Sequence, residues 1–115
     1  MILPNRGLKL PADTDDLLRK LKLRTKVTPN VISRISFFKS VESGERYTGQ
    51  TQVIDGSLTL DKITWLGELS DIIEATLKML YPNLNNEKEY YQAWVYHVVH
   101  GTKMLRMVKS IDDLI

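Results

Sequence analysis

Two prolines placed at predicted helix starts constrain the fold of the first 44 residues more than any other feature. Proline suits the first turn of a helix, because its fixed φ is already helical and its missing N–H has no partner there. Pro11 follows an extended segment, Gly7-Leu8-Lys9-Leu10, and Pro29 follows Thr28, whose hydroxyl can cap a helix. Gly44 can end the second helix in the left-handed conformation. Residues 6–44 are therefore predicted to form a strand followed by two helices.

Charge divides the chain into a basic head and an acidic body. Residues 1–46 hold ten of the sixteen Lys and Arg residues and five of the fourteen acids, a net charge of +5, while the remainder carries −3. The overall charge of +2 hides this division. A basic strand–helix–helix unit favours nucleic acid as its partner over a catalytic role.

The first predicted helix has an apolar face and a basic stripe. Leu17, Leu18 and Leu21 share one face, and acids are confined to the first turn, where the helix dipole favours them. Arg19, Lys22 and Lys26 recur at i, i+3 and i+7 on another face. This stripe is either a solvated surface or a set of phosphate contacts.

The second predicted helix has an apolar face and, opposite it, a row of serines. The expected apolar face is Val31, Ile32, Ile35, Phe38 and Val41. The serines are Ser33, Ser36, Ser40 and Ser43, which fit either solvent or a closely approaching helix. Arg34 lies beside the apolar sector, either as an arginine that snorkels or pairs with an acid at a subunit interface, or as a phosphate contact.

The second half of the chain is predicted to be mostly helical. Asp55-Gly56 indicates either a hairpin or a loop that brings Leu58, Leu60, Ile63 and Trp65 to the core. One helix is expected between Gly67 and Tyr81-Pro82, and a last one from near Asn86. Gly101 falls on the inner face of the last helix, which indicates a close crossing by another element.

The residues give no indication of catalysis, a metal site or membrane insertion. Cysteine is absent, which excludes disulfides and thiolate metal sites. His97 and His100 are the only histidines, and His97 is interpreted as a core residue with one satisfied nitrogen. No Ser-His-acid grouping with a recognisable context is found. No apolar run spans a bilayer and the start does not read as a secretory signal, so we expect a cytoplasmic protein that needs no cofactor.

A strand–helix–helix unit of this size cannot bury all its apolar surfaces alone. The ribbon-helix-helix solution pairs two chains, so that their strands form an antiparallel ribbon that enters the major groove of DNA. Alternation would direct Gly7 and Lys9 outward. Lysine makes a point-charge contact, so this ribbon would bind the DNA backbone and discriminate bases poorly.

The sequence also resembles the DndE family, small DNA-binding components of the bacterial DNA phosphorothioation system. The segments that carry the resemblance occur in the same order along nearly the whole chain: Leu3-Pro4-Asn5-Arg6, Leu21-Lys22-Leu23-Arg24-Thr25, Thr28-Pro29-Asn30, Ser33-Arg34, Ser40-Val41-Glu42-Ser43-Gly44, Asp55-Gly56, Leu66-Gly67-Glu68 and His100-Gly101.

The resemblance implies a non-catalytic, oligomeric partner of the sulfur-inserting enzymes that binds nicked double-stranded DNA through lysines. It adds the other basic residues of the first helix as candidates. The family often has further basic residues after position 6, whereas Gly7-Leu8 stand here, which moves the expected DNA contact toward this helix. The candidate DNA-binding residues are Lys9, Arg19, Lys20, Lys22, Arg24, Lys26 and Arg34.

The expected fold is mainly α, in a single domain over 1–115. A ribbon-helix-helix-like basic head (6–44) precedes a helical body (45–115) with two further helices, and the protein is a homo-oligomer, dimeric or tetrameric. The expected function is accessory binding of double-stranded, possibly nicked, DNA with little sequence specificity, beside other phosphorothioation proteins. The alternatives are a sequence-specific ribbon-helix-helix repressor and an assembly adaptor for the modification enzymes that binds no DNA itself.

Overall fold

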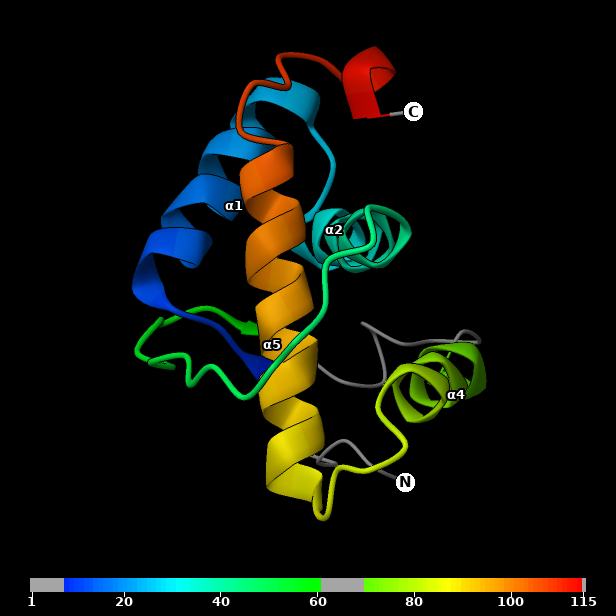
Figure 1. Ribbon diagram of the computed structural model, residues 1–115. Helices are drawn as coiled ribbons and strands as arrows, with labels where there is room; N and C mark the ends of the chain where they lie inside the picture. The colour runs from blue at the N-terminus through cyan, green and yellow to red at the C-terminus, as the bar shows by residue number, and fades with distance from the viewer. Residues whose placement is uncertain (1–7, 61–69, 115) are drawn as a thin grey trace.

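The computed structural model describes residues 8–60 and 70–114. The terminal and central segments of the family resemblance at 3–6 and 66–68, together with Gly7, Ile63 and Trp65, lie outside the described residues. The fold is mainly helical, as predicted (Figure 1). Its elements are β1 (Leu8–Lys9), α1 (Ala12–Thr25), α2 (Pro29–Glu42), β2 (Thr59–Leu60), α4 (Ser70–Leu80), α5 (Glu87–Met104) and the short 3-10 helix η2 (Ile111–Leu114).

Local sequence signals mark the helix ends where they were expected. The Thr28 hydroxyl accepts a hydrogen bond from Val31 N at 3.5 Å, and Pro29 begins α2. The Asn86 side chain caps α5 by accepting from Glu89 N at 2.9 Å. Helix α1 begins after Pro11 and ends at Lys26, which adopts a left-handed φ of 62°. Gly44 has a φ of 88°, as its predicted role requires.

Helix α5 is the centre of the fold. Figure 1 shows it running through the molecule with α1 and α2 against it, and α2 makes the most extensive contact. Gly101 allows this contact, because a β-carbon at that position would lie 1.7 Å from the Ser36 carbonyl oxygen. The close crossing that the sequence predicts is therefore confirmed, and its partner is the backbone of α2.

Helix α2 turns its serine face to the core. Ser33, Ser36 and Ser40 are fully buried, whereas Val31 is exposed. Ile32 is fully buried, and Ile35, Phe38 and Val41 are partly buried and pack against the core, so the expected apolar face is wrong only at Val31. The close approach at Gly101 brings Ser36 against α5, while Phe37 packs its ring edge-on against His97 of α5.

The buried serine hydroxyls are satisfied locally. Ser36 Oγ donates to Ile32 O at 2.9 Å, and Ser33 Oγ donates to Asn30 O at 2.8 Å. Thr102 Oγ1 on α5 donates to Ser36 Oγ at 3.1 Å. A serine that bonds within its own helix can be buried at little cost, because its polar group keeps a partner.

The strand before α1 pairs within its own chain. β1 and β2 are antiparallel, with Leu8 opposite Leu60 and Lys9 opposite Thr59. The described residues therefore place β1 in a two-stranded sheet within one chain, and the ribbon between two chains stays a prediction. Of the two interpretations of Asp55-Gly56, the loop is correct: it delivers Leu60 to the core, where that side chain is 1% exposed.

The loop reaches β1 because it is anchored on the start of α1. Gly56 N donates to Leu10 O at 2.9 Å, and Ala12 N donates to Asp55 Oδ1 at 2.8 Å. Leu58 N donates to Asp15 Oδ2 at 2.9 Å. Asp15 is buried, and its burial raises the pKa of its carboxyl group. Asp15, expected from the sequence to complement the dipole of α1, therefore also holds the 55–58 loop.

Candidate functional site

Basic side chains cover the outer surface of α1. Lys20, Lys22 and Lys26 are exposed, and they surround Leu23, which is 81% exposed. Because residues 20 and 24 lie on one flank of the helix and 22 and 26 on the other, the basic surface is broader than the single stripe that spacing predicts. The sequence between Leu17 and Val41 contains no acidic residue.

Two of the predicted contact residues also hold the fold together. Arg19 Nη2 donates to Ser57 Oγ at 3.0 Å, and Arg19 Nη1 lies 3.5 Å from Asp16 Oδ1. Both members of this ion pair are well exposed, so it contributes little to stability. Arg24 Nη1 donates to Arg106 O at 3.0 Å. Arg19 thus ties the 55–58 loop to α1, and Arg24 ties α1 to the end of α5.

The contact made by Arg24 brings a second basic segment beside α1. Figure 1 shows the C-terminal ends of α1 and α5 at the same end of the molecule. Lys103, Arg106 and Lys109 are exposed there, and Arg106 Nη1 donates to Lys103 O at 2.8 Å. Sequence reasoning missed these residues, although their regular spacing of three at the end of the last helix could have indicated them. We call the exposed lysines of α1 and these three residues together the basic surface.

The remaining two candidates lie apart from this helix. Lys9 is exposed on β1, and its backbone is fixed by Tyr91 of α5, whose hydroxyl accepts from Lys9 N at 2.8 Å and donates to Lys9 O at 3.2 Å. Arg34 lies on α2, where it lines a surface groove. The groove is lined by Val31, Arg34, Ile35, Phe38, Lys39 and Glu42. The structure therefore brings the α1 candidates together and places Arg34 on a different face.

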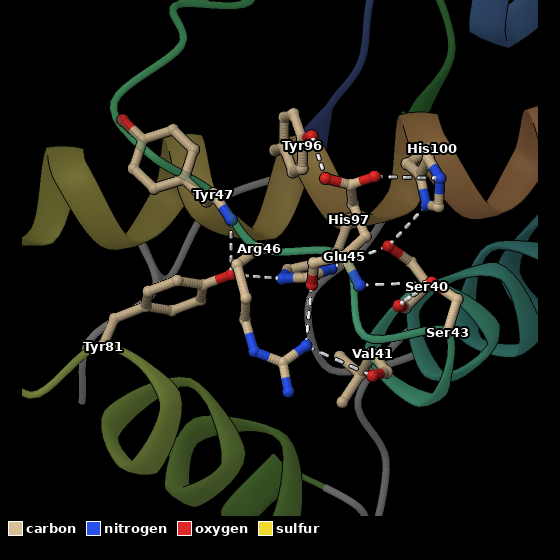
Figure 2. A network of polar contacts seen from close by, with 10 residues as sticks. All are labelled: Ser40, Val41, Ser43, Glu45, Arg46, Tyr47, Tyr81, Tyr96, His97 and His100. Atoms are coloured by element: carbon tan, nitrogen blue, oxygen red, sulfur yellow. Dashed lines mark hydrogen bonds and ion pairs between the residues drawn. The ribbon is translucent and has the colours of Figure 1, made fainter.

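A buried polar network joins α2 to α5 (Figure 2). His97 is fully buried, with Nδ1 2.7 Å from Ser40 Oγ and Nε2 2.5 Å from the Tyr81 hydroxyl. Ser40 Oγ also lies 2.9 Å from His100 Nδ1. His97 is the core histidine that the sequence predicts, but both of its nitrogens are hydrogen-bonded. Burial, reinforced by the positive charge of Arg46, lowers the pKa of His97 to about 4.

Glu45 forms the solvent-facing end of the network. Its Oε2 lies 3.5 Å from His100 Nε2, and its Oε1 accepts from the Tyr96 hydroxyl at 3.0 Å. If His100 donates to Glu45, its Nδ1 accepts from Ser40, and the Ser40 oxygen accepts from His97 Nδ1. His97 Nε2 then accepts from Tyr81. This assignment gives every bond one donor and one acceptor.

The network contains a Ser-His-acid grouping that sequence reasoning did not predict. Ser40, His100 and Glu45 follow the order of a hydrolase triad. Ser40 is fully buried, however, and its hydroxyl is bonded to two imidazoles, so a substrate could not reach it. The grouping connects α2, the 43–47 segment and α5.

Among residues 8–60 and 70–114, no group of three or more His, Asp or Glu side chains could hold a metal ion. Within the same described ranges, no helix has the length and apolar character needed to cross a bilayer.

Comparison with known proteins gives a consistent result. The family model described as DNA sulphur modification protein DndE matches residues 7–113. A crystal structure of DndE from Escherichia coli B7A, involved in DNA phosphorothioation modification, is 48% identical. The match covers 90% of this chain and 97% of that one, with a TM-score of 0.82. A glycine-to-lysine double mutant of DndE, involved in DNA phosphorothioation, is also 48% identical, covering 90% and 98% with a TM-score of 0.79. No curated protein sequence matches this chain.

Proposed function

Since this chain belongs to the DndE family of DNA sulphur modification proteins, we propose that it serves phosphorothioation as a non-catalytic protein that binds double-stranded DNA. The proposal places it in the cytoplasm, as one domain, beside the enzymes that exchange a phosphate oxygen for sulfur. The observation that carries it is the basic surface of α1 and the end of α5, which suits a polyanionic backbone.

The chemistry of this surface favours binding without base recognition. Lysine ammonium groups neutralise phosphates but lack the planar, bidentate geometry that distinguishes bases. Nicks, which leave the phosphate backbone otherwise intact, are compatible with such a surface. If several subunits together neutralise about 4–8 phosphates, the slope of log affinity against log salt concentration is about −4 to −7.

A binding titration against intact duplex, nicked duplex and single strand of one sequence tests the proposal. It is run at two salt concentrations with the wild type and with two matched variants. Lys22→Ala/Lys26→Ala removes two charges from the basic surface, and Lys78→Ala/Lys88→Ala removes two exposed charges from α4 and the start of α5.

We expect the first variant to bind all three DNAs more weakly and to reduce the magnitude of the salt slope by about 2, and the second variant to match the wild type. Equal affinities for both variants would overturn the assignment of α1. Tighter binding to the nicked duplex than to the intact duplex would support a role at a strand break.

The adaptor is the second candidate, because Leu23 is exposed in the middle of the basic surface. An exposed apolar side chain surrounded by bases suits an acidic protein surface as well as DNA. Failure to retain any of the three DNAs at physiological salt, with tight binding to a phosphorothioation enzyme, would favour it. The sequence-specific repressor has less support, because β1 pairs with β2 of the same chain.

The protein is proposed to act as a homo-oligomer. A single copy offers only a few phosphate contacts, and joining copies multiplies the contacts without any change in the individual site. Light scattering on the purified protein measures the number of copies directly.

A further inference from the structure

The hydroxyl group of Ser40 lies between two imidazole rings in the buried network (Figure 2). Its oxygen is 2.7 Å from His97 Nδ1 and 2.9 Å from His100 Nδ1, and Ser40 is fully buried. A buried hydroxyl with two partners keeps both hydrogen bonds only if it donates to one partner and accepts from the other. One of the two Nδ1 atoms therefore carries a hydrogen while the other is bare.

His100 decides which of the two states is present, because it reaches solvent and His97 does not. The His100 side chain is 31% exposed, and its Nε2 lies 3.5 Å from Glu45 Oε2. A carboxylate can only accept, so neutral His100 carries its hydrogen on Nε2 and leaves Nδ1 bare. Ser40 then donates to His100 and accepts from His97. The bare Nε2 of His97 accepts from the Tyr81 hydroxyl, 2.5 Å away.

A proton taken up by His100 reverses the direction of these bonds. We propose that Ser40 couples the charge of His100 to the buried His97, so that protonation of His100 switches neutral His97 from the Nδ1–H to the Nε2–H tautomer. Protonated His100 has a hydrogen on both nitrogens, so Ser40 accepts from it and donates to His97 Nδ1. The net change is the uptake of one proton from water at His100. His97 loses one hydrogen at Nδ1 and gains one at Nε2, by exchange with water when the contact transiently opens.

The reversal reaches the backbone through Tyr81, which is itself buried. The Tyr81 hydroxyl also accepts a hydrogen bond from Tyr47 N at 2.8 Å. While His97 accepts from it, this hydroxyl donates one bond and accepts one. After the switch it accepts from both Tyr47 N and His97 Nε2, and its own hydrogen loses its acceptor. Because an unsatisfied buried donor is costly, the bond from Tyr47 weakens. Acidification therefore loosens the segment that follows α2.

The groups that face the two histidines keep the charge on His100. Burial, reinforced by the positive charges of Arg46 and His100, lowers the pKa of His97 to about 4. Glu45 favours a positive charge on His97 as well, but the contact that it makes is with His100. Tyr96 stacks on the His100 ring and donates its hydroxyl to Glu45. His97 therefore stays neutral over the range in which an accessible histidine gains its proton.

An NMR titration of the imidazole nitrogens from about pH 8 to about pH 5 tests the coupling. The nitrogen resonances separate bare from hydrogen-bearing nitrogens, so the tautomer and charge of each ring are measured directly. The wild type is compared with Ser40→Ala, which removes the shared hydroxyl, and with His100→Gln, which removes the titrating ring. Ser36→Ala is the matched control, because Ser36 is also fully buried on α2 and its hydroxyl bonds to Ile32 O and Thr102. Circular dichroism reports whether each variant is folded.

In the wild type and in Ser36→Ala, we expect His97 to change from Nδ1–H to Nε2–H in step with the protonation of His100. Over the same range, the protection factor of the Tyr47 amide hydrogen against exchange should fall about fivefold. In Ser40→Ala and His100→Gln, His97 should keep one tautomer throughout, and the Tyr47 protection factor should change less than about twofold.

Three outcomes overturn the inference. His97 could keep its tautomer while His100 becomes protonated, His97 could still switch in Ser40→Ala or His100→Gln, or His100 could stay neutral down to pH 5. An unchanged protection factor at Tyr47 would refute the effect on the backbone. If Ser40→Ala does not fold, His100→Gln decides the question by itself. None of these variants removes a charge from the basic surface, so the result is independent of the DNA titration.

Discussion

Lowering the pH from 7 to 5 tests how tightly the buried network constrains His97. The imidazole accepts from Tyr81 and contacts Ser40 inside the α2–α5 contact, and burial lowers its pKa from 6.5 to about 4. Above pH 6.5 the ring is neutral in both the folded and the unfolded chain, so it adds no pH dependence. Below pH 6.5 the unfolded chain binds a proton that the folded protein does not, and stability therefore falls until the pH reaches about 4.

The size of this loss follows from the two pKa values. A pKa difference between 6.5 and about 4 corresponds to a loss of about 3 kcal/mol once the pH is below both values, at about 1.4 kcal/mol for each pH unit. At pH 5 about 2 kcal/mol of it is already lost. Asp15 acts in the opposite direction, because its raised pKa means that the folded protein holds a proton more tightly as the pH falls.

Urea unfolding of the wild type and His97→Gln, at pH 7 and pH 5, separates the two contributions. Asp15 and the other acids titrate in both proteins, so the difference between the two pH responses isolates His97. We expect the unfolding free energy of the wild type to fall by about 2 kcal/mol more than that of the variant. Parallel pH responses would refute the assigned burial of a neutral imidazole. In Asp15→Asn, measured in the same way, the unfolding free energy should fall more between pH 7 and pH 5 than it does in the wild type.

Two further predictions concern the helices. Gly101→Ala should lower the unfolding free energy by about 3 kcal/mol despite the better helix propensity of alanine, because its β-carbon would overlap the Ser36 carbonyl. The comparison variant is Gly49→Ala, at a residue with a φ of 98° and no neighbour within 4 Å. It should lower the free energy measured by denaturant unfolding by only about 1–2 kcal/mol. Thr28→Ala should lower the unfolding free energy by about 1 kcal/mol, because it removes the cap of α2, whereas Thr28→Ser should preserve stability. An equal loss of unfolding free energy in both variants would show that the hydroxyl does not act as the cap.

The family and the basic character of α1 could be read from the sequence, because both depend on residues close together in the chain. Lys20, Lys22 and Lys26 lie away from the buried Leu18 and Leu21 on the same helix, and all three are exposed. The extension of the basic surface to Lys103 and Arg106 could not be read in this way. It depends on Arg24 reaching the Arg106 carbonyl across 82 positions of sequence.

The orientation of α2 shows why periodicity alone failed there. The apolar row and the serine row are equally regular, and hydrophobicity favours burying the former. The close approach that Gly101 permits places the Ser36 backbone against α5, and Ser33, Ser36 and Ser40 are buried together with Ile32 and Phe37.

By itself the sequence determined the helix limits, since a cap or a proline acts on backbone groups within one turn. It also determined the surplus of positive charge in the first half and the need for a close crossing at Gly101. Only the tertiary structure decided which face of α2 is buried, that β1 pairs with β2, and that Ser40, His97 and Tyr81 share one network. These outcomes depend on contacts between segments that are far apart in the sequence. Packing of the whole molecule brings these segments together, and the spacing of residues within one segment does not reveal it.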